Sequence, residues 1–175
     1  MWRVMFSMNN QQLLIVAFAL VALPSAYFLL NNSPDVPEVG IEVGKFVTGF
    51  SMDVHGGGTF TLDGESNEVM IINFMATWCG SCNSELEILR AINEEVDDVT
   101  IVTVVIDVFM ASEDFTDWAN GKDLPWIVGY FPEAANKYKV TLVPTTIIVD
   151  RNGVIRERFT YRTYNELLTL ISKYL

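Results

Sequence analysis

The chain has 175 residues, half of them hydrophobic, so it is long enough to bury the core of one domain. Its formal net charge is −11, and all 22 acidic residues lie at or after Asp35. Because so acidic a chain repels phosphate groups, we expect no nucleic-acid partner. The charge favours solubility, but it identifies neither a fold nor a substrate.

The first distinct segment is 13–30, LLIVAFALVALPSAYFLL, which contains no charged residue. A helix needs about 20 apolar residues to cross a hydrocarbon core, so residues 1–30 are predicted to form a membrane anchor or signal segment. Arg3 precedes this segment, which favours a cytoplasmic N-terminus and an extracytoplasmic remainder. The alternatives are a signal peptide cleaved after Ala26 and a buried soluble helix. We favour a retained anchor because the segment is longer than a typical signal-peptide core and Pro24 is unfavourable beside that cleavage site.

Residues 31–44 contain two prolines and two glycines without a sustained period, which predicts a linker before a domain at 45–175. Two short strands, at 45–50 and 59–64, are expected on either side of the glycine-rich turn HGGG. His55 in this turn is expected to be a solvated loop residue.

A buried strand is predicted at 68–76, a helix at 84–96 and a second apolar strand at 100–107. Two such strands flanking one helix indicate a parallel βαβ unit that is buried on both faces.

The rest of the chain continues to alternate between helices and strands. The expected elements are a helix at 113–120 between Ser112 and Gly121, a short helix from Pro132 to Tyr138, a hairpin of strands 145–150 and 154–161, and a last helix at 164–175. An Asn-Gly pair supplies the turn of the hairpin, and Thr163 with Glu166 forms a capping box for the last helix.

The two cysteines of the chain, Cys79 and Cys82, lie where the first buried strand ends and a helix begins. The thiol of Cys79 is expected at the helix N-terminus, where unpaired N–H groups and the helix dipole favour the thiolate. The pKa of a free cysteine is about 8.5, and it falls to between about 3.5 and 7.5 in Cys-x-x-Cys pairs at such sites. We therefore predict that Cys79 is the nucleophile and that Cys82, one turn further on, resolves the mixed disulfide.

Three other roles exist for this thiol pair. A structural disulfide closing so small a ring would stabilise the fold by only about 2 kcal/mol. A zinc site needs about four ligands, and His55 is the single histidine of the chain. Two inert core cysteines would be unusual where a strand ends and a helix begins, because that position is exposed. Redox chemistry is therefore the interpretation that we favour.

The stretch NFMATWCGSCNSELEIL resembles the active-site stretch of thioredoxin-like proteins, and specifically of the membrane-tethered TlpA/ResA branch, with its pattern Asn-Phe-Trp-Ala-Thr-Trp-Cys-x-x-Cys-x-x-Glu. Downstream, VTLVPTTIIVDRNGVI is similar to that branch's Pro-Thr-Thr strand and Asn-Gly turn. The resemblance spans about residues 40–175. It implies an α/β thioredoxin-like fold, with a central mixed β-sheet flanked by helices. It also implies an activity that needs no organic cofactor and no metal.

The resemblance also implies roles for four residues near the thiols. Trp78 would pack beside the thiols and help to form a partner-docking surface. Pro144 would be the cis-proline facing the disulfide, with Val143 offering backbone groups to an extended substrate peptide; an ordinary trans proline at a strand start is the alternative. Glu85 would tune the proton balance of the thiols, or it is a solvated acid of the first helical turn.

Departures from the family pattern limit what the resemblance implies. Asn73 stands where ordinary thioredoxins have a buried aspartate, and Met75 replaces a tryptophan. Ser81 replaces the proline of the cytosolic dipeptide, and the reduction potential is expected within the range of about −270 to −120 mV that such proteins span. Phe109 and Phe131 are candidates for substrate recognition.

The sequence predicts a thiol–disulfide oxidoreductase anchored in a membrane, with its catalytic domain on the extracytoplasmic side. Its expected partners are exported cysteine-containing proteins, among them apocytochrome thiols in cytochrome c maturation, and a membrane electron donor or acceptor. One alternative is a peroxiredoxin-type peroxidase, although the Pro-x-x-x-Thr-x-x-Cys context is missing. Another is a copper-handling assembly protein, although its cysteines would be spaced by three with a histidine after them. A noncatalytic docking module is the third alternative.

Overall fold

The computed structural model describes residues 11, 23, 27, 37–64 and 68–175. The chain divides into two units, Met1–Val36 and Pro37–Leu175. The predicted anchor at 1–30 lies almost entirely outside the described residues. Within the described part of the chain, no helix combines the length and the apolar character needed to span a bilayer.

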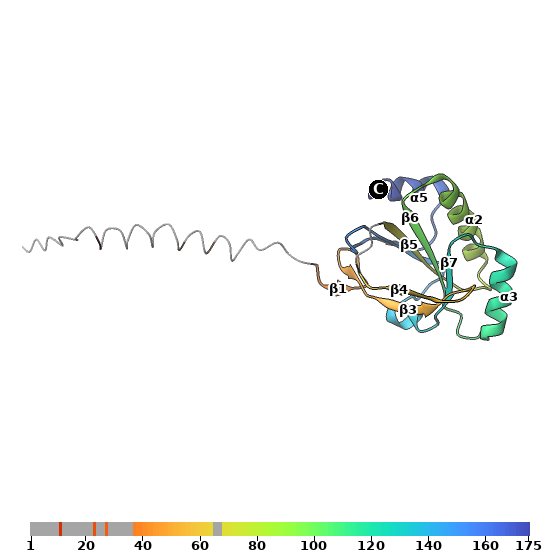
Figure 1. The fold of residues 1–175 in the computed structure, drawn as a ribbon. Helices are drawn as coiled ribbons and strands as arrows, with labels where there is room; N and C mark the ends of the chain where they lie inside the picture. The colour runs from red at the N-terminus through yellow and green to blue at the C-terminus, as the bar shows by residue number, and fades with distance from the viewer. Residues whose placement is uncertain (1–10, 12–22, 24–26, 28–36, 65–67) are drawn as a thin grey trace, which may run out of the picture. The chain divides into compact units, whose positions relative to one another are not determined.

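The unit from Pro37 is built around one five-stranded sheet (Figure 1). The order of its strands is β7-β6-β5-β8-β9, with β5, β6 and β7 parallel, β8 antiparallel to β5 and β9 antiparallel to β8. The strands are β5 (Val69–Met75), β6 (Val99–Val105), β7 (Ile127–Tyr130), β8 (Thr145–Val149) and β9 (Ile155–Phe159). This arrangement confirms the expected thioredoxin-like α/β fold with a mixed sheet.

Two hydrophobic clusters cover the two faces of the sheet, because side chains of a strand alternate between faces. One cluster joins the sheet to α2 (Gly80–Glu95), α3 (Ser112–Lys122) and α5 (Tyr164–Ile171). The other joins it to α4 (Ala134–Lys137) and to the hairpin of β3 (Phe50–Asp53) and β4 (Thr59–Leu62). The central strand β5 is buried along its whole length.

A short parallel pair precedes the hairpin, formed by β1 (Val39–Gly40) and β2 (Phe46–Val47). Thr48 also donates its N–H to the carbonyl of Gly40. The second half of the predicted linker at 31–44 therefore belongs to the compact unit that begins at Pro37.

Most predicted elements are confirmed, including the strands at 68–76 and 100–107, the hairpin of β8 and β9 and the capping box of α5. Several predicted boundaries were wrong, and one strand was missed. The helix α2 begins at Gly80 rather than at 84, α3 continues through Gly121 to Lys122, and α5 ends at Ile171 rather than at 175. The predicted strand at 45–50 is divided between β2 and β3, and β7 was not predicted. The residue that ends α3 is Asp123, which adopts the left-handed conformation with φ 48°.

Candidate active site

The thiol pair lies at the carboxyl end of β5, where the chain turns into α2. Cys79 is the N-cap residue of α2, with extended backbone angles (φ −83°, ψ 114°). Its Sγ accepts a hydrogen bond from the N–H of Cys82 at 3.1 Å. The sulfur of Cys79 therefore sits at the helix N-terminus, where the dipole and the first N–H groups stabilise negative charge.

Cys79 and Cys82 form a disulfide, and their Cα atoms are 5.2 Å apart. Cys79 is 6% exposed, whereas Cys82 has no exposed surface. A partner sulfur can thus reach Cys79 but not Cys82. The small exposed fraction also means that a partner must approach the surface around Cys79 closely.

A loop far along the chain faces the disulfide. The Val143–Pro144 peptide bond is cis, as the resemblance implied, so the trans alternative for Pro144 is wrong. The carbonyl oxygen of Val143 lies 3.6 Å from Sγ of Cys79. Thr145, which opens β8, donates its hydroxyl to the carbonyl of Leu142 at 2.7 Å and closes this loop.

Glu85 lies on α2 one turn beyond Cys82, and it is completely buried. The alternative of a solvated first-turn acid is therefore wrong. Its carboxylate accepts hydrogen bonds from Nδ2 of Asn73 at 2.8 Å and from Oγ1 of Thr146 at 3.1 Å. Burial raises the pKa of Glu85 from 4.5 to about 7, although the two hydrogen bonds oppose that rise.

Asn73 and Thr146 complete a small polar cluster around this acid. The amide of Asn73 also donates to Oγ1 of Thr146 at 3.0 Å, and the two residues are partners in the β5–β8 register. Oδ1 of Asn73 is buried and has no hydrogen-bond partner within the described part of the chain. No local pattern indicates the role of Thr146, because that role depends on the register of two strands far apart in the chain.

A second loop adjoins the active-site turn from the end of β6. Asp107 accepts a hydrogen bond from the hydroxyl of Thr77 at 3.0 Å and another from the N–H of Phe109 at 3.1 Å. Thr77 lies two residues before Cys79. The Asp107 carboxylate therefore joins the loop after β6 to the segment that carries the nucleophile, a link that the sequence did not reveal.

Apolar side chains of the active-site turn and of the loop after β6 project into solvent. Trp78 is 72% exposed and directly precedes Cys79. Phe109 is 93% exposed. Phe131, the other candidate for substrate recognition, is half-buried and stacks on Phe50 with ring centroids 5.6 Å apart, so it packs against the core.

His55 lies in the turn between β3 and β4, and its N–H donates to the carbonyl of Val128 in β7. It is half-buried and its ring meets Phe115 edge-on at 6.4 Å, so it packs against the domain instead of standing in solvent as expected. It lines a pocket of about 450 Å³ together with Phe115 and Tyr130. In residues 37–64 and 68–175, no group of three or more His, Cys, Asp or Glu side chains is placed to hold a metal ion.

The chain is similar in sequence to known thioredoxin-like proteins. The model of the AhpC/TSA family matches residues 43–158. The thioredoxin-like protein YneN of Bacillus subtilis is 30% identical over 123 residues, which cover 69% of this chain and 72% of YneN. The thiol-disulfide oxidoreductase ResA of Geobacillus kaustophilus is 22% identical over 87% of this chain and 90% of its own.

A solved structure shares the fold. It is the exposed lipoprotein thioredoxin Etrx1 of Streptococcus pneumoniae, with a TM-score of 0.65 and 22% sequence identity. The match covers 72% of this chain and 99% of Etrx1.

Proposed function

The chain belongs to the AhpC/TSA family, and from this membership we propose that it exchanges disulfides with exported cysteine-containing proteins. Its enzyme class is that of the thiol–disulfide oxidoreductases. One observation carries the proposal: the Sγ atom of Cys79 caps α2, accepts the N–H of Cys82 and lies beside the Val143 carbonyl.

In the reducing direction, the thiolate of Cys79 attacks one sulfur of a substrate disulfide. The substrate S–S bond breaks, its other sulfur leaves as a thiolate that takes up a proton, and a mixed disulfide to Cys79 forms. Cys82 then loses its proton and attacks Sγ of Cys79, which releases the second substrate thiolate and leaves the Cys79–Cys82 disulfide. Two electrons pass to the substrate, so a dithiol donor must reduce the pair again. The oxidising direction is the same sequence in reverse.

Glu85 is proposed to accept the proton of Cys82. The two residues are three positions apart on one face of α2, so their side chains are neighbours. A pKa of about 7 suits a group that both accepts and releases a proton near neutral pH. This route replaces the buried aspartate that ordinary thioredoxins have at the position of Asn73.

The substrate is proposed to bind in an extended conformation along the loop of Val143 and Pro144, with Trp78 on the same surface. Support comes from the position of the Val143 carbonyl beside the nucleophile and from the exposure of Trp78.

The proposed location is the extracytoplasmic side of a membrane, with residues 1–30 as the anchor. Support comes from the apolar segment 13–30 and from Etrx1, which is described as an exposed lipoprotein. Exported proteins, including apocytochromes with reduced thiols, are the proposed substrates, and a membrane protein is the proposed electron donor or acceptor.

Reduction of insulin disulfides by dithiothreitol tests the function. We expect wild-type protein to accelerate the reaction, Cys79→Ser to abolish the acceleration and Cys82→Ser to reduce it strongly. Ser51→Ala, an exposed change in the β3–β4 hairpin, is the control and should retain full activity. Full activity of Cys79→Ser would contradict the proposal, as would hydrogen peroxide consumption or copper binding by a wild-type protein that fails to reduce insulin.

A further inference from the structure

We propose that Trp78, Val108, Phe109 and Leu142, here called the apolar rim, bind an extended partner segment that carries a bulky apolar side chain beside its cysteine. This inference rests on the proposed function. It predicts which cysteines of partner proteins the enzyme accepts, and it assigns to Phe109 a role in selecting them.

The apolar rim comes from three separate loops. Its four side chains are 62% to 93% exposed, with Phe109 the most exposed of them. Exposed apolar side chains gathered at one place mark interaction sites on soluble proteins, because keeping them in water costs free energy that a partner can recover.

The turn that carries Val108 and Phe109 is held by hydrogen bonds at both ends. Asp107 accepts the N–H of Phe109 on its side chain at 3.1 Å and the N–H of Met110 on its carbonyl at 3.4 Å. The hydroxyl of Tyr130 lies 2.9 Å from the Asp107 carbonyl and 2.6 Å from the Met110 carbonyl. These contacts already hold the turn in one conformation. Binding of a partner therefore costs little conformational entropy in this turn, which favours affinity.

Chain connectivity or a hydrogen bond joins each of the three loops to the segment around the nucleophile. The hydroxyl of Thr77, beside Trp78, donates to Asp107 at 3.0 Å. Leu142 precedes Val143, whose carbonyl lies 3.6 Å from Sγ of Cys79. Since Cys79 is only 6% exposed, a segment that presents its sulfur there must come close to the loops beside it, which carry Trp78 and Leu142.

The negative charge of the chain further limits which partner segments can bind. Exposed Glu113 and Asp114 follow the turn in the first helical turn of α3, and the chain as a whole carries a net charge of −11. These charges repel anionic thiols such as glutathione and acidic peptides. The preferred segment is therefore apolar beside its cysteine and neutral or basic overall.

The test uses the full chain and three disulfide substrates: oxidised glutathione and two disulfide-linked peptides of equal length and zero net charge. One peptide has phenylalanine or leucine on both sides of its cysteine, and the other has serine there. We expect wild-type protein to prefer the apolar peptide, and Phe109→Ser to lower kcat/KM for that peptide about tenfold through KM. Turnover of oxidised glutathione should not change.

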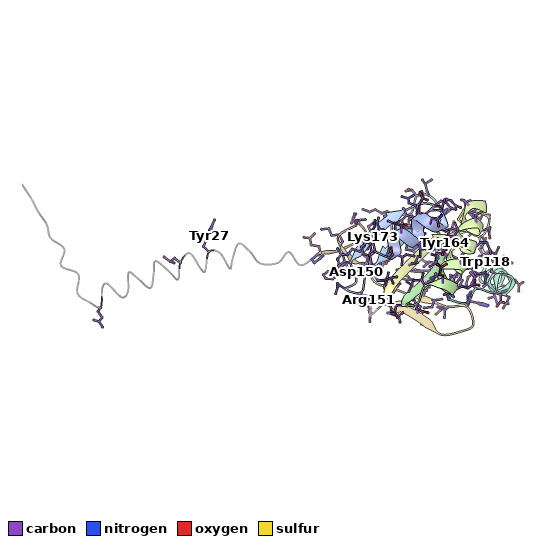
Figure 2. The ribbon with its side chains drawn as sticks, turned by 90° about the horizontal axis from the view of Figure 1, so that it is seen from above. Tyr27, Trp118, Asp150, Arg151, Tyr164 and Lys173 are labelled. Carbon is purple, nitrogen blue, oxygen red and sulfur yellow. A yellow bond between two sulfur atoms is a disulfide. The ribbon has the colours of Figure 1, made fainter. Side chains whose placement is uncertain are left out.

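The matched control is Val43→Ser, which removes an apolar side chain that is 56% exposed. Val43 precedes Gly44, whose N–H bonds the carbonyl of Ile155 at the start of β9, the opposite end of the sheet from the thiols. Figure 2 labels Asp150 and Arg151, in the turn before β9, on the other side of the domain from Trp118 of α3. The control should behave as wild type with all three substrates.

Two outcomes would overturn the inference: an unchanged kcat/KM for the apolar peptide in Phe109→Ser, or an equal fall for the peptide and for oxidised glutathione. In either case wild-type turnover of the substrates would leave the proposed function intact. If wild-type protein reduced none of them, the proposed function itself would fail.

Discussion

Glu85 is a carboxylic acid without exposed surface, one helical turn beyond Cys82. Its folded-state pKa of about 7 lies above the ordinary value of 4.5 because burial disfavours the charged form. Below pH 4.5 the group is neutral in the folded and the unfolded chain, so its full contribution to stability is present. As the pH rises through 7, the unfolded chain has already ionised this group, and the folded state loses about 3 kcal/mol of stability.

Glu85→Gln should remove this pH dependence, since the amide stays neutral at every pH. With the disulfide formed, urea unfolding between pH 4.5 and 8.5 should show wild-type stability falling by about 3 kcal/mol relative to the variant. Glu87→Gln, an exposed change on the same helix, is the control and should follow the wild-type curve. Parallel curves for wild type and Glu85→Gln would contradict the raised pKa.

At the scale of elements, the edge strand β7 meets the β3–β4 hairpin at Gly129. Gly129 forms an antiparallel bridge with Val54. A Cβ at Gly129 would lie 2.5 Å from Sδ of Met52 and 2.8 Å from the carbonyl oxygen of Asp53. The hairpin can cover the edge of the sheet only because this residue has no side chain.

Gly129→Ala should therefore destabilise the domain by about 1–3 kcal/mol, because the overpacked contact must push the hairpin away from β7. Gly121→Ala is the matched change: it lies inside α3, a Cβ added there would meet nothing within 4 Å, and it should stabilise by about 0.5–1 kcal/mol. Thermal unfolding measures both. If the two variants shifted the melting temperature in the same direction, the close approach of hairpin and sheet would be refuted.

The elements that the sequence predicts are those with long local patterns. Mostly apolar runs revealed the seven-residue strands β5 and β6, and the Asn-Gly pair revealed the turn between β8 and β9. β7 has only four residues and includes Gly129, so its pattern is too short to recognise. β1 lies in a segment whose prolines and glycines indicate a loop, and only its pairing with β2 makes it a strand.

The residues of the active site also divide into those that the sequence predicts and those that it does not. Cys79, Cys82 and Glu85 share one local segment, so their spacing alone places them at the start of a helix. Other partners come from β8 and its preceding loop, more than fifty residues away in the chain: Thr146 for Glu85 and the Val143 carbonyl for Cys79. Thr146 meets Asn73 only through the antiparallel register of β5 and β8, and Asp107 meets Thr77 only because β5 and β6 end side by side. Such tertiary pairings leave no periodic signal in the sequence.

At the scale of the whole molecule, the thioredoxin-like unit begins at Pro37, and the apolar segment 13–30 precedes it. A retained anchor would hold the enzyme at a membrane, where a membrane donor or acceptor could exchange electrons with it repeatedly. Tethering raises the effective concentration of such a partner. The anchor is thus the part of the proposal that determines which partners the enzyme meets.

The paired change Val16→Lys and Leu20→Lys tests the anchor, since each lysine near the centre of a membrane helix costs about 2.5–3.5 kcal/mol on insertion scales. We expect wild-type protein to stay in the membrane pellet after an alkaline carbonate wash and the double variant to be lost from it. Val43→Lys adds a charge to an exposed position of the domain and should stay with the membrane. Wild-type protein released by the wash, or shortened to a start after Ala26, would count against a retained anchor.

The most direct measurement is the rate at which Cys79 is alkylated by iodoacetamide as a function of pH, in reduced wild-type protein and in Cys82→Ser. We expect the rate to titrate with a midpoint between about 3.5 and 7.5, because the N-terminus of α2 stabilises the thiolate. A midpoint at about 8.5, the value of an unstructured cysteine, would show that Cys79 is not activated and would contradict its role as the attacking sulfur.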